Sequence, residues 1–90
     1  MIPKHRAPTH PGEILEEEFL KPLGMTQVAL AAKMGVPIQR VNTIISGKRG
    51  VTAETAVLLA RVLKTSAEFW MNLQSKFDLW HAERELAKRA

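Results

Sequence analysis

The sequence predicts an all-α protein of five helices, and three observations support that fold class. Apolar residues recur at three- to four-residue spacing along most of the chain, which is the period of an amphipathic helix. No segment shows the strict alternation of apolar and polar residues that is typical of a half-buried strand. Proline, glycine and N-capping residues divide the chain into helix-length segments. With 90 residues, a single domain is expected over residues 10–90, preceded by a flexible arm over residues 1–9.

The first helix is expected to begin at Pro11, because proline suits the first helical turn, and to stop at Pro22 and Gly24. Its inward-facing stripe is expected to consist of Ile14, Leu15, Phe19 and Leu20. The three adjacent carboxylates at residues 16–18 are interpreted as a solvated face. Consecutive residues of a helix point in different directions, so these groups are poorly placed to share a metal ion or to perform acid–base catalysis.

A second and a third helix are predicted on either side of a break at Gly35 and Pro37. Thr26 is expected to be the N-cap of the second helix, and Gly35 is expected to end it in the left-handed conformation. The residues expected on its buried side are Val28, Leu30, Ala31 and Met34. The third helix is expected to end at about Ser46. Two short helices joined by a glycine-containing turn form a helix-turn-helix, here over residues 26–48.

The fourth and fifth helices follow a second glycine-rich turn. Thr52 is expected to cap the fourth helix, residues 53–64, which is apolar nearly all round and therefore belongs in the centre of the core. A capping box formed by Thr65 and Glu68 is expected to start the fifth helix, residues 66–88.

The apolar residues of the fifth helix cover two stripes. The first, with Phe69, Leu73 and Trp80 as a further candidate, is expected to dock this helix on the fourth. The second, centred on Trp70 and Phe77, is expected to form the seam of a two-fold homodimer, because a monomer would leave it in contact with water. The residues assigned to dimerisation are Trp70, Met71, Phe77, Leu79 and Trp80. The alternative is that the helix folds back and buries both stripes within one chain.

The net charge of +4 is concentrated on the predicted helix-turn-helix. Residues 26–50 contain Lys33, Arg40, Lys48 and Arg49 and no acidic residue. Such a patch is typical of a surface that binds nucleic-acid phosphates, because a carboxylate there would repel the phosphate backbone. The alternative interpretation is a basic face that contacts only solvent.

The third helix carries side chains suited to reading DNA. The face opposite its apolar side holds Gln39 and Thr43, with Arg40 and Asn42 on its flanks, and is expected to reach base edges in a major groove. The residues expected to hold phosphates are Thr26, Gln27, Ser46, Lys48 and Arg49. The first two of these open the second helix, where free N–H groups and the helix dipole favour an anion.

Three stretches of the sequence resemble the HigA family of antitoxins: HPGE at residues 10–13, GKRGVT at residues 47–52 and AEFWMNLQ at residues 67–74. The resemblance extends from about His10 to Trp80. It implies a lambda-repressor-like helix-turn-helix fold and a homodimer that binds double-stranded DNA and represses its own operon. It also implies a cognate toxin as protein partner, usually a RelE-like ribonuclease that acts on the ribosome.

The same resemblance implies particular DNA contacts. Gln27, Gln39 and Thr43 fall in DNA-facing positions. Ile38 stands where related repressors often place a polar base-reading side chain, so an apolar contact with a thymine methyl group is expected there instead. Two copies related by a dyad would read a palindromic operator with half-sites about 34–36 Å apart or a multiple of that distance.

No enzymatic or cofactor site is expected. Cysteine is absent, and His5, His10 and His81 are scattered without metal-ligand spacing. There is no nucleophile elbow and no glycine-rich phosphate loop. No apolar run reaches the roughly 18 residues that span a bilayer, so a cytoplasmic protein with no membrane contact is expected. Two alternatives remain open: a phage-type repressor without a toxin partner, and a protein-interaction module that has lost DNA binding.

Overall fold

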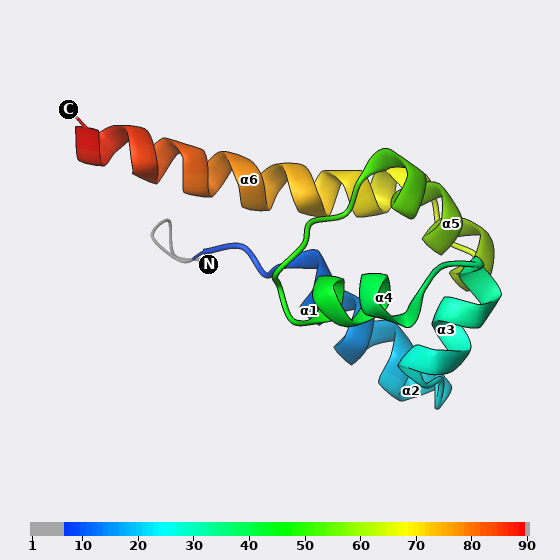
Figure 1. Cartoon of the computed structure of the whole chain (residues 1–90). Coiled ribbons are helices and arrows are strands. Elements are labelled where there is room, and N and C mark those ends of the chain that lie inside the picture. The colour runs from blue at the N-terminus through cyan, green and yellow to red at the C-terminus, as the bar shows by residue number, and fades with distance from the viewer. Residues whose placement is uncertain (1–6, 90) are drawn as a thin grey trace.

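The computed structural model describes residues 7–89, which form helices joined by short turns and contain no strand (Figure 1). The first helix consists of three successive segments, α1 (Pro11–Ile14), the π-helical η1 (Leu15–Leu20) and α2 (Lys21–Leu23). The helices that follow are α3 (Gln27–Met34), α4 (Ile38–Ile45), α5 (Ala53–Leu63) and α6 (Ala67–Arg89). The predicted all-α fold of five helices is confirmed for this part of the chain. Residues 1–6 of the predicted arm lie outside the described residues.

The first helix ends at Leu23 with Gly24 as its C-cap, which confirms the predicted end at Pro22 and Gly24, and Pro22 itself lies within the last turn. In η1 the helical turn is wider than in an α-helix, and the backbone N–H of Lys21 donates to the carbonyl of Glu16. Proline has no N–H, and its ring clashes with the carbonyl four residues back in a regular α-helix. The wider turn accommodates that ring. The C-cap residue Gly24 adopts a φ of 63°, a left-handed conformation that favours glycine.

The beginning of the first helix packs closely against the end of α4. Nδ1 of His10 accepts a hydrogen bond from the N–H of Gly12 at 2.9 Å, and this bond caps α1. A Cβ atom on Gly12 would lie 1.9 Å from the carbonyl oxygen of Ile44. Glycine is therefore required at this position for α1 and α4 to approach each other so closely.

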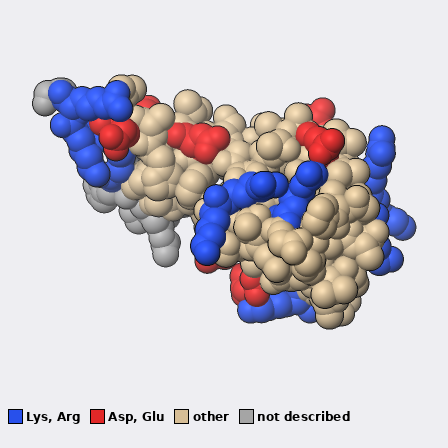
Figure 2. All heavy atoms as spheres, in the orientation of Figure 1, with Lys and Arg blue, Asp and Glu red and all other residues tan. Residues whose placement is uncertain are grey.

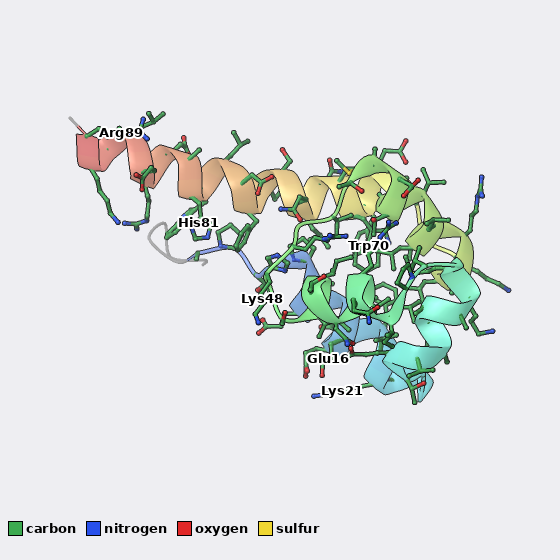
Figure 3. All side chains as sticks on the ribbon, in the orientation of Figure 1. Glu16, Lys21, Lys48, Trp70, His81 and Arg89 are labelled. Atoms are coloured by element: carbon green, nitrogen blue, oxygen red, sulfur yellow. The ribbon has the colours of Figure 1, made fainter. Side chains whose placement is uncertain are left out.

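Trp70 of α6 lies in the centre of the hydrophobic core. Its side chain has no solvent exposure, and its Nε1 donates to Oγ1 of Thr65 at 2.8 Å. Its ring centroid is 5.2 Å from that of Phe19 in η1. Figure 3 shows Trp70 pointing from α6 toward the other helices. The remaining buried apolar side chains of the core are Leu15, Leu20, Leu30, Ala31, Met34, Val41, Ile44, Val51, Ala56 and Leu59.

This position corrects the expected orientation of α6. Trp70 is expected from sequence on the dimer seam, but it is inaccessible to a partner because it is buried within its own chain. Gln74, one turn further on, is also buried, whereas Phe69 is 38% exposed. α6 carries large apolar residues on more than one face, so its periodicity does not identify the face that docks. Packing against the first helix selects the face with the indole, whose large ring fills this part of the core.

The other dimerisation residues have different environments. Met71 packs against the core, and the Phe77 ring lies edge-on to the His10 ring with centroids 4.8 Å apart. Trp80 is partly buried, and the guanidinium of Arg84 lies 4.2 Å from its ring centroid. Leu79 is 60% exposed. Of the five residues assigned to the seam, Leu79 is therefore the most accessible to a second chain.

The predicted caps have mixed outcomes. Thr52 accepts a hydrogen bond from a backbone N–H in the first turn of α5, as expected. The expected capping box of Thr65 and Glu68 is wrong, because Oγ of Ser66 instead accepts from the N–H of Phe69 at 3.0 Å. The hydroxyl of Thr65 is occupied by the indole N–H in the core.

The second half of α6 projects from the helical body (Figure 1). Every residue from 81 to 89 is exposed, including Leu86, which is 60% exposed. This projection makes the molecule elongated, with principal extents of 45 × 28 × 21 Å. None of the helices within residues 7–89 combines the length and the apolar character needed to cross a membrane.

Candidate nucleic-acid interface

The helix-turn-helix is formed by α3, a tight turn and α4. Gly35 ends α3 with a φ of 72°, and its N–H donates to the carbonyl of Ala32 at 3.2 Å. Pro37 has the extended backbone of an N-cap and starts α4. The left-handed glycine predicted at this turn is confirmed. Because glycine adopts this conformation without strain, it allows the chain to reverse between two helices within a few residues.

Buried apolar residues hold the two helices against the body. Ala31 and Met34 of α3 are buried, and so are Val41 and Ile44 of α4. Val28 is 68% exposed, so its expected place on the buried side is wrong. At about 100° per residue, Val28 lies about 110° from the middle of the arc formed by the buried residues of α3, so its side chain is on the flank of that helix.

The outward face of α4 carries polar side chains. Gln39, Asn42 and Ser46 are exposed, and Thr43 is partly exposed. The hydroxyl of Thr43 donates to the carbonyl of Gln39 at 2.8 Å, which leaves its oxygen lone pairs as acceptors. The face therefore offers amide donors and acceptors of the kind that recognise base edges in a major groove.

Two of the expected base-reading residues of α4 also make contacts within the chain. Ile38 is partly buried and packs against the hydrophobic core, so its side chain lies at the border of the outward face of α4. Its expected contact with a thymine methyl group stays a prediction. Nη1 of Arg40 is 2.9 Å from Oε1 of Glu54, so Arg40 is engaged in an ion pair rather than free on the surface. Glu54 lies in the first turn of α5.

The segment after α4 folds back onto the end of that helix. Gly47 has a φ of 81°, and the N–H groups of both Lys48 and Arg49 donate to the carbonyl of Thr43, at 2.9 and 3.0 Å. Both cationic side chains are exposed beside the exposed Ser46 (Figure 3 labels Lys48). In the space-filling view, basic side chains extend across the segment between α4 and α5 (Figure 2). This arrangement brings two cations to the end of the outward face of α4.

The beginning of α3 offers a further anion-compatible surface. Oγ1 of Thr26 accepts from the N–H of Ala29 at 3.0 Å, which confirms the predicted N-cap. Gln27, the first residue of α3, is partly exposed. These residues border a small depression of about 290 Å³ between α2 and α3, which is also lined by Glu16 and Lys21.

A larger polar pocket of about 590 Å³ lies between α4, α5 and α6. Its lining residues are Arg40, Arg49, Gly50, Val51, Thr52, Glu54, Thr55, Gln74 and Asp78. Two of them were missed by sequence reasoning. Oε1 of Gln74 accepts a hydrogen bond from the backbone N–H of Val51, and no local pattern predicts this bond because the two residues are 23 positions apart. Glu54 carries a signal that could have been used: it is the sole acidic residue among residues 19–67, which contain seven basic residues.

No metal-binding group of three or more His, Asp or Glu side chains occurs within residues 7–89. The surface on α4 and the segment after it is a polar helix face flanked by exposed cations, and it offers hydrogen-bonding groups. Such a surface suits recognition of a nucleic acid, because cations contact phosphates and polar side chains contact base edges.

Comparison with known proteins agrees with this surface. The helix-turn-helix domain family matches residues 17–70. The fold and the polar face of α4 thus define a helix-turn-helix protein.

Three similar proteins place the chain more narrowly. Antitoxin HigA-1 of Vibrio cholerae is 43% identical over 86 residues, which are 94% of this chain and 80% of that protein. The structure of the Pseudomonas aeruginosa antitoxin HigA with the higBA promoter has a TM-score of 0.87 and 44% identity, and the match covers 91% of this chain and 89% of that one. The structure of antitoxin GraA in complex with its operator has a TM-score of 0.86 and 43% identity, with 99% and 90% coverage. The chain belongs to the HigA family of antitoxins.

Proposed function

We propose that this protein is an antitoxin that binds operator DNA as a two-fold dimer, represses its own operon and neutralises a cognate toxin. The observation that carries the DNA-binding part is the outward face of α4, which presents Gln39, Asn42 and Thr43 next to the exposed cations Lys48 and Arg49. Support comes from two antitoxins of the same fold that were solved with promoter or operator DNA.

In this proposal α4 enters a major groove. Gln39 and Thr43 contact base edges, and Asn42 contacts the rim of the groove. An amide side chain is suited to adenine, because it can donate to N7 and accept from the N6 amino group at the same time.

Phosphates on the two sides of the groove are held by different elements. Gln27 and the N-terminus of α3, capped by Thr26, contact one strand. Ser46, Lys48 and Arg49 contact the other strand from the segment after α4. These contacts give affinity and register but little sequence information, since every nucleotide carries a phosphate.

The dimer is formed through the projecting half of α6. Leu79 and Leu86 are both 60% exposed and lie seven residues apart, so they share one face of the helix. Burying that face against a second copy removes apolar surface from water. A dimer also places two α4 helices on one side of the DNA, as a palindromic operator requires.

The proposed neutralisation of a toxin is supported by membership of the HigA family. It is not argued from any contact among the described residues. We propose a RelE-like ribonuclease as the toxin. The test is to express the product of the neighbouring reading frame alone and together with this protein. Growth arrest by the neighbour that is relieved on co-expression, with copurification of the two proteins, supports the antitoxin role. A harmless neighbour, or two proteins that do not copurify, would leave a repressor without a toxin.

The DNA-binding part is tested with a duplex from the promoter upstream of the gene and a scrambled duplex of equal length and composition. Tight binding to the promoter duplex alone is expected. Gln39→Ala should weaken that binding by about 1–3 kcal/mol and leave binding to the scrambled duplex unchanged. The matched control is Gln27→Ala, which removes the same side chain from a phosphate contact and should weaken both duplexes alike. A wild-type protein that does not distinguish the two duplexes would refute the proposal.

A further inference from the structure

The ion pair between Arg40 and Glu54 joins α4 to α5 at the border of the proposed DNA surface. Nη1 of Arg40 and Oε1 of Glu54 are 2.9 Å apart. The two side chains differ in accessibility, because that of Arg40 is 29% exposed and that of Glu54 is 73% exposed. The Arg40 stem therefore packs along the protein, while the carboxylate that holds its guanidinium faces solvent.

The position of Glu54 in the charge pattern is unusual. Glu54 is the sole acidic residue among residues 19–67, where seven basic residues occur. It lies directly against the cation of α4, whereas the other carboxylate of the same pocket, Asp78, accepts a hydrogen bond from Nε2 of Gln74 at 2.9 Å. Arg49, the other cation lining the pocket, has no ion pair within residues 7–89. The acidic group is thus matched to one particular arginine.

An arginine beside the DNA can act in two ways. A guanidinium that is free to move binds any phosphate within reach, and this attraction is the same for every sequence. A guanidinium held by a carboxylate keeps further N–H donors in a fixed orientation, and directed donors of this kind distinguish one base step from another. Glu54 also adds one negative charge beside the proposed DNA surface, and a negative charge there would oppose sequence-independent binding to phosphates.

We propose that Glu54 is a specificity-determining residue that acts by positioning Arg40, a role that rests on the DNA-binding function proposed above. By holding the guanidinium against α5, Glu54 prevents Arg40 from serving as a general phosphate anchor. The N–H donors of Arg40 that remain are kept at the edge of α4 for directed contacts with bases. Glu54 itself does not contact a base. Its removal should therefore tighten binding to all DNA while weakening the preference for the operator.

The measured quantity is a selectivity ratio, defined as the Kd for the scrambled duplex divided by the Kd for the promoter duplex. Glu54→Ala should lower this ratio about ten-fold, chiefly by tightening binding to the scrambled duplex. The slope of log Kd against log salt concentration for the scrambled duplex should become steeper by about one unit. Glu68→Ala is the matched control. Both glutamates are the second residue of their helices, so both changes remove one carboxylate from a first helical turn. The control should change the ratio by less than about two-fold.

A second pair of variants tests whether Glu54 acts through Arg40. In an Arg40→Met background, which keeps an unbranched apolar stem, Glu54→Ala should no longer change the ratio more than Glu68→Ala does. Far-UV circular dichroism and thermal unfolding should show that all variants are folded, since an exposed ion pair contributes little to stability.

The outcomes separate this inference from the proposed function. A wild-type protein that selects the promoter duplex, combined with equal effects of Glu54→Ala and Glu68→Ala, would refute the role of Glu54 and leave operator binding intact. An effect of Glu54→Ala that persists in full in the Arg40→Met background would refute positioning of Arg40. A wild-type protein without selectivity would refute both proposals.

Discussion

Gln74 of α6 accepts a hydrogen bond from the backbone N–H of Val51 at 2.7 Å, and this bond ties the segment after α4 to the longest helix of the fold. Gly50, the residue before Val51, also lies close to Gln74, because a Cβ on Gly50 would lie 2.8 Å from Nε2 of Gln74. The buried side-chain amide of Gln74 therefore holds the segment that carries Lys48 and Arg49 in place.

Gln74→Leu should destabilise the fold by about 1–3 kcal/mol, because it leaves the buried N–H of Val51 without a partner. The same change should weaken binding to any DNA duplex, since the cations of the loop lose their support. Urea unfolding measures the first effect, and titration of the scrambled duplex measures the second. Asn72→Ala changes an exposed amide of the same helix and should alter neither quantity. Normal stability of Gln74→Leu would show that the loop does not depend on this bond.

Gly12→Ala should destabilise the protein by about 1–3 kcal/mol or more, because the added methyl group overlaps the carbonyl of Ile44. In the structure the Cβ would lie 1.9 Å from that oxygen, so α1 and α4 must move apart. Thermal unfolding measures the loss. Glu13→Ala, at the exposed neighbouring position, serves as the control and should have little effect. An unchanged midpoint for Gly12→Ala would contradict the close approach of the two helices.

The dimer prediction now depends on Leu79 rather than on Trp70. Leu79→Ser should shift the protein toward the 10.1 kDa monomer in sedimentation at micromolar concentration, while its unfolding midpoint at high concentration stays near that of the wild type. Trp70→Ala should instead unfold the chain, at a cost of about 3–5 kcal/mol, because the indole fills the core. Loss of the dimer on Trp70→Ala with the fold intact would support the original seam. A stable Leu79→Ser dimer would exclude the projecting half of α6.

Stability should fall below neutral pH through His10. The pKa of this histidine is lowered from its ordinary value of 6.5, mainly because burial penalises the charged ring, while the carboxylates of Asp78 and Glu13 partly oppose that effect. The neutral ring is also needed for capping, since Nδ1 accepts the hydrogen bond from Gly12.

The direction of the pH effect follows from linkage. The folded protein binds a proton at His10 less readily than the unfolded chain does, so this contribution to stability is complete above pH 6.5 and is lost as the pH falls through the lowered folded pKa. Urea unfolding between pH 8 and 5 should show the loss. His10→Asn, which can cap α1 at any pH, should reduce the dependence. A dependence that is undiminished in His10→Asn would place its origin elsewhere.

Features that depend on neighbouring residues were predictable from the sequence. The cap at Thr26 and the left-handed turn at Gly35 need only the conformational preferences of a few consecutive residues, and both occur where the sequence predicts them. The helical period places Val41 and Ile44 on the inner side of α4, and the polar residues of its outer face follow from that assignment.

Competition between local signals was harder to resolve. Pro22 and Gly24 both predict a helix end, and the choice between them depends on whether the preceding turn can widen. Ser66 and Thr65 can both cap α6, but the hydroxyl of Thr65 is taken by the indole of Trp70. In each case a contact or a backbone adjustment outside the local motif decides the outcome.

The sequence by itself therefore determined the five helices, the helix-turn-helix between residues 26 and 48 and the concentration of positive charge on it. These features arise from backbone preferences and from the spacing of side chains along the chain. Only the tertiary structure decided that Trp70 is buried, that Gln74 holds the N–H of Val51 and that Glu54 pairs with Arg40. The reason is that such contacts join residues 5 to 23 positions apart on different elements, and their partners depend on how whole helices pack rather than on any local pattern.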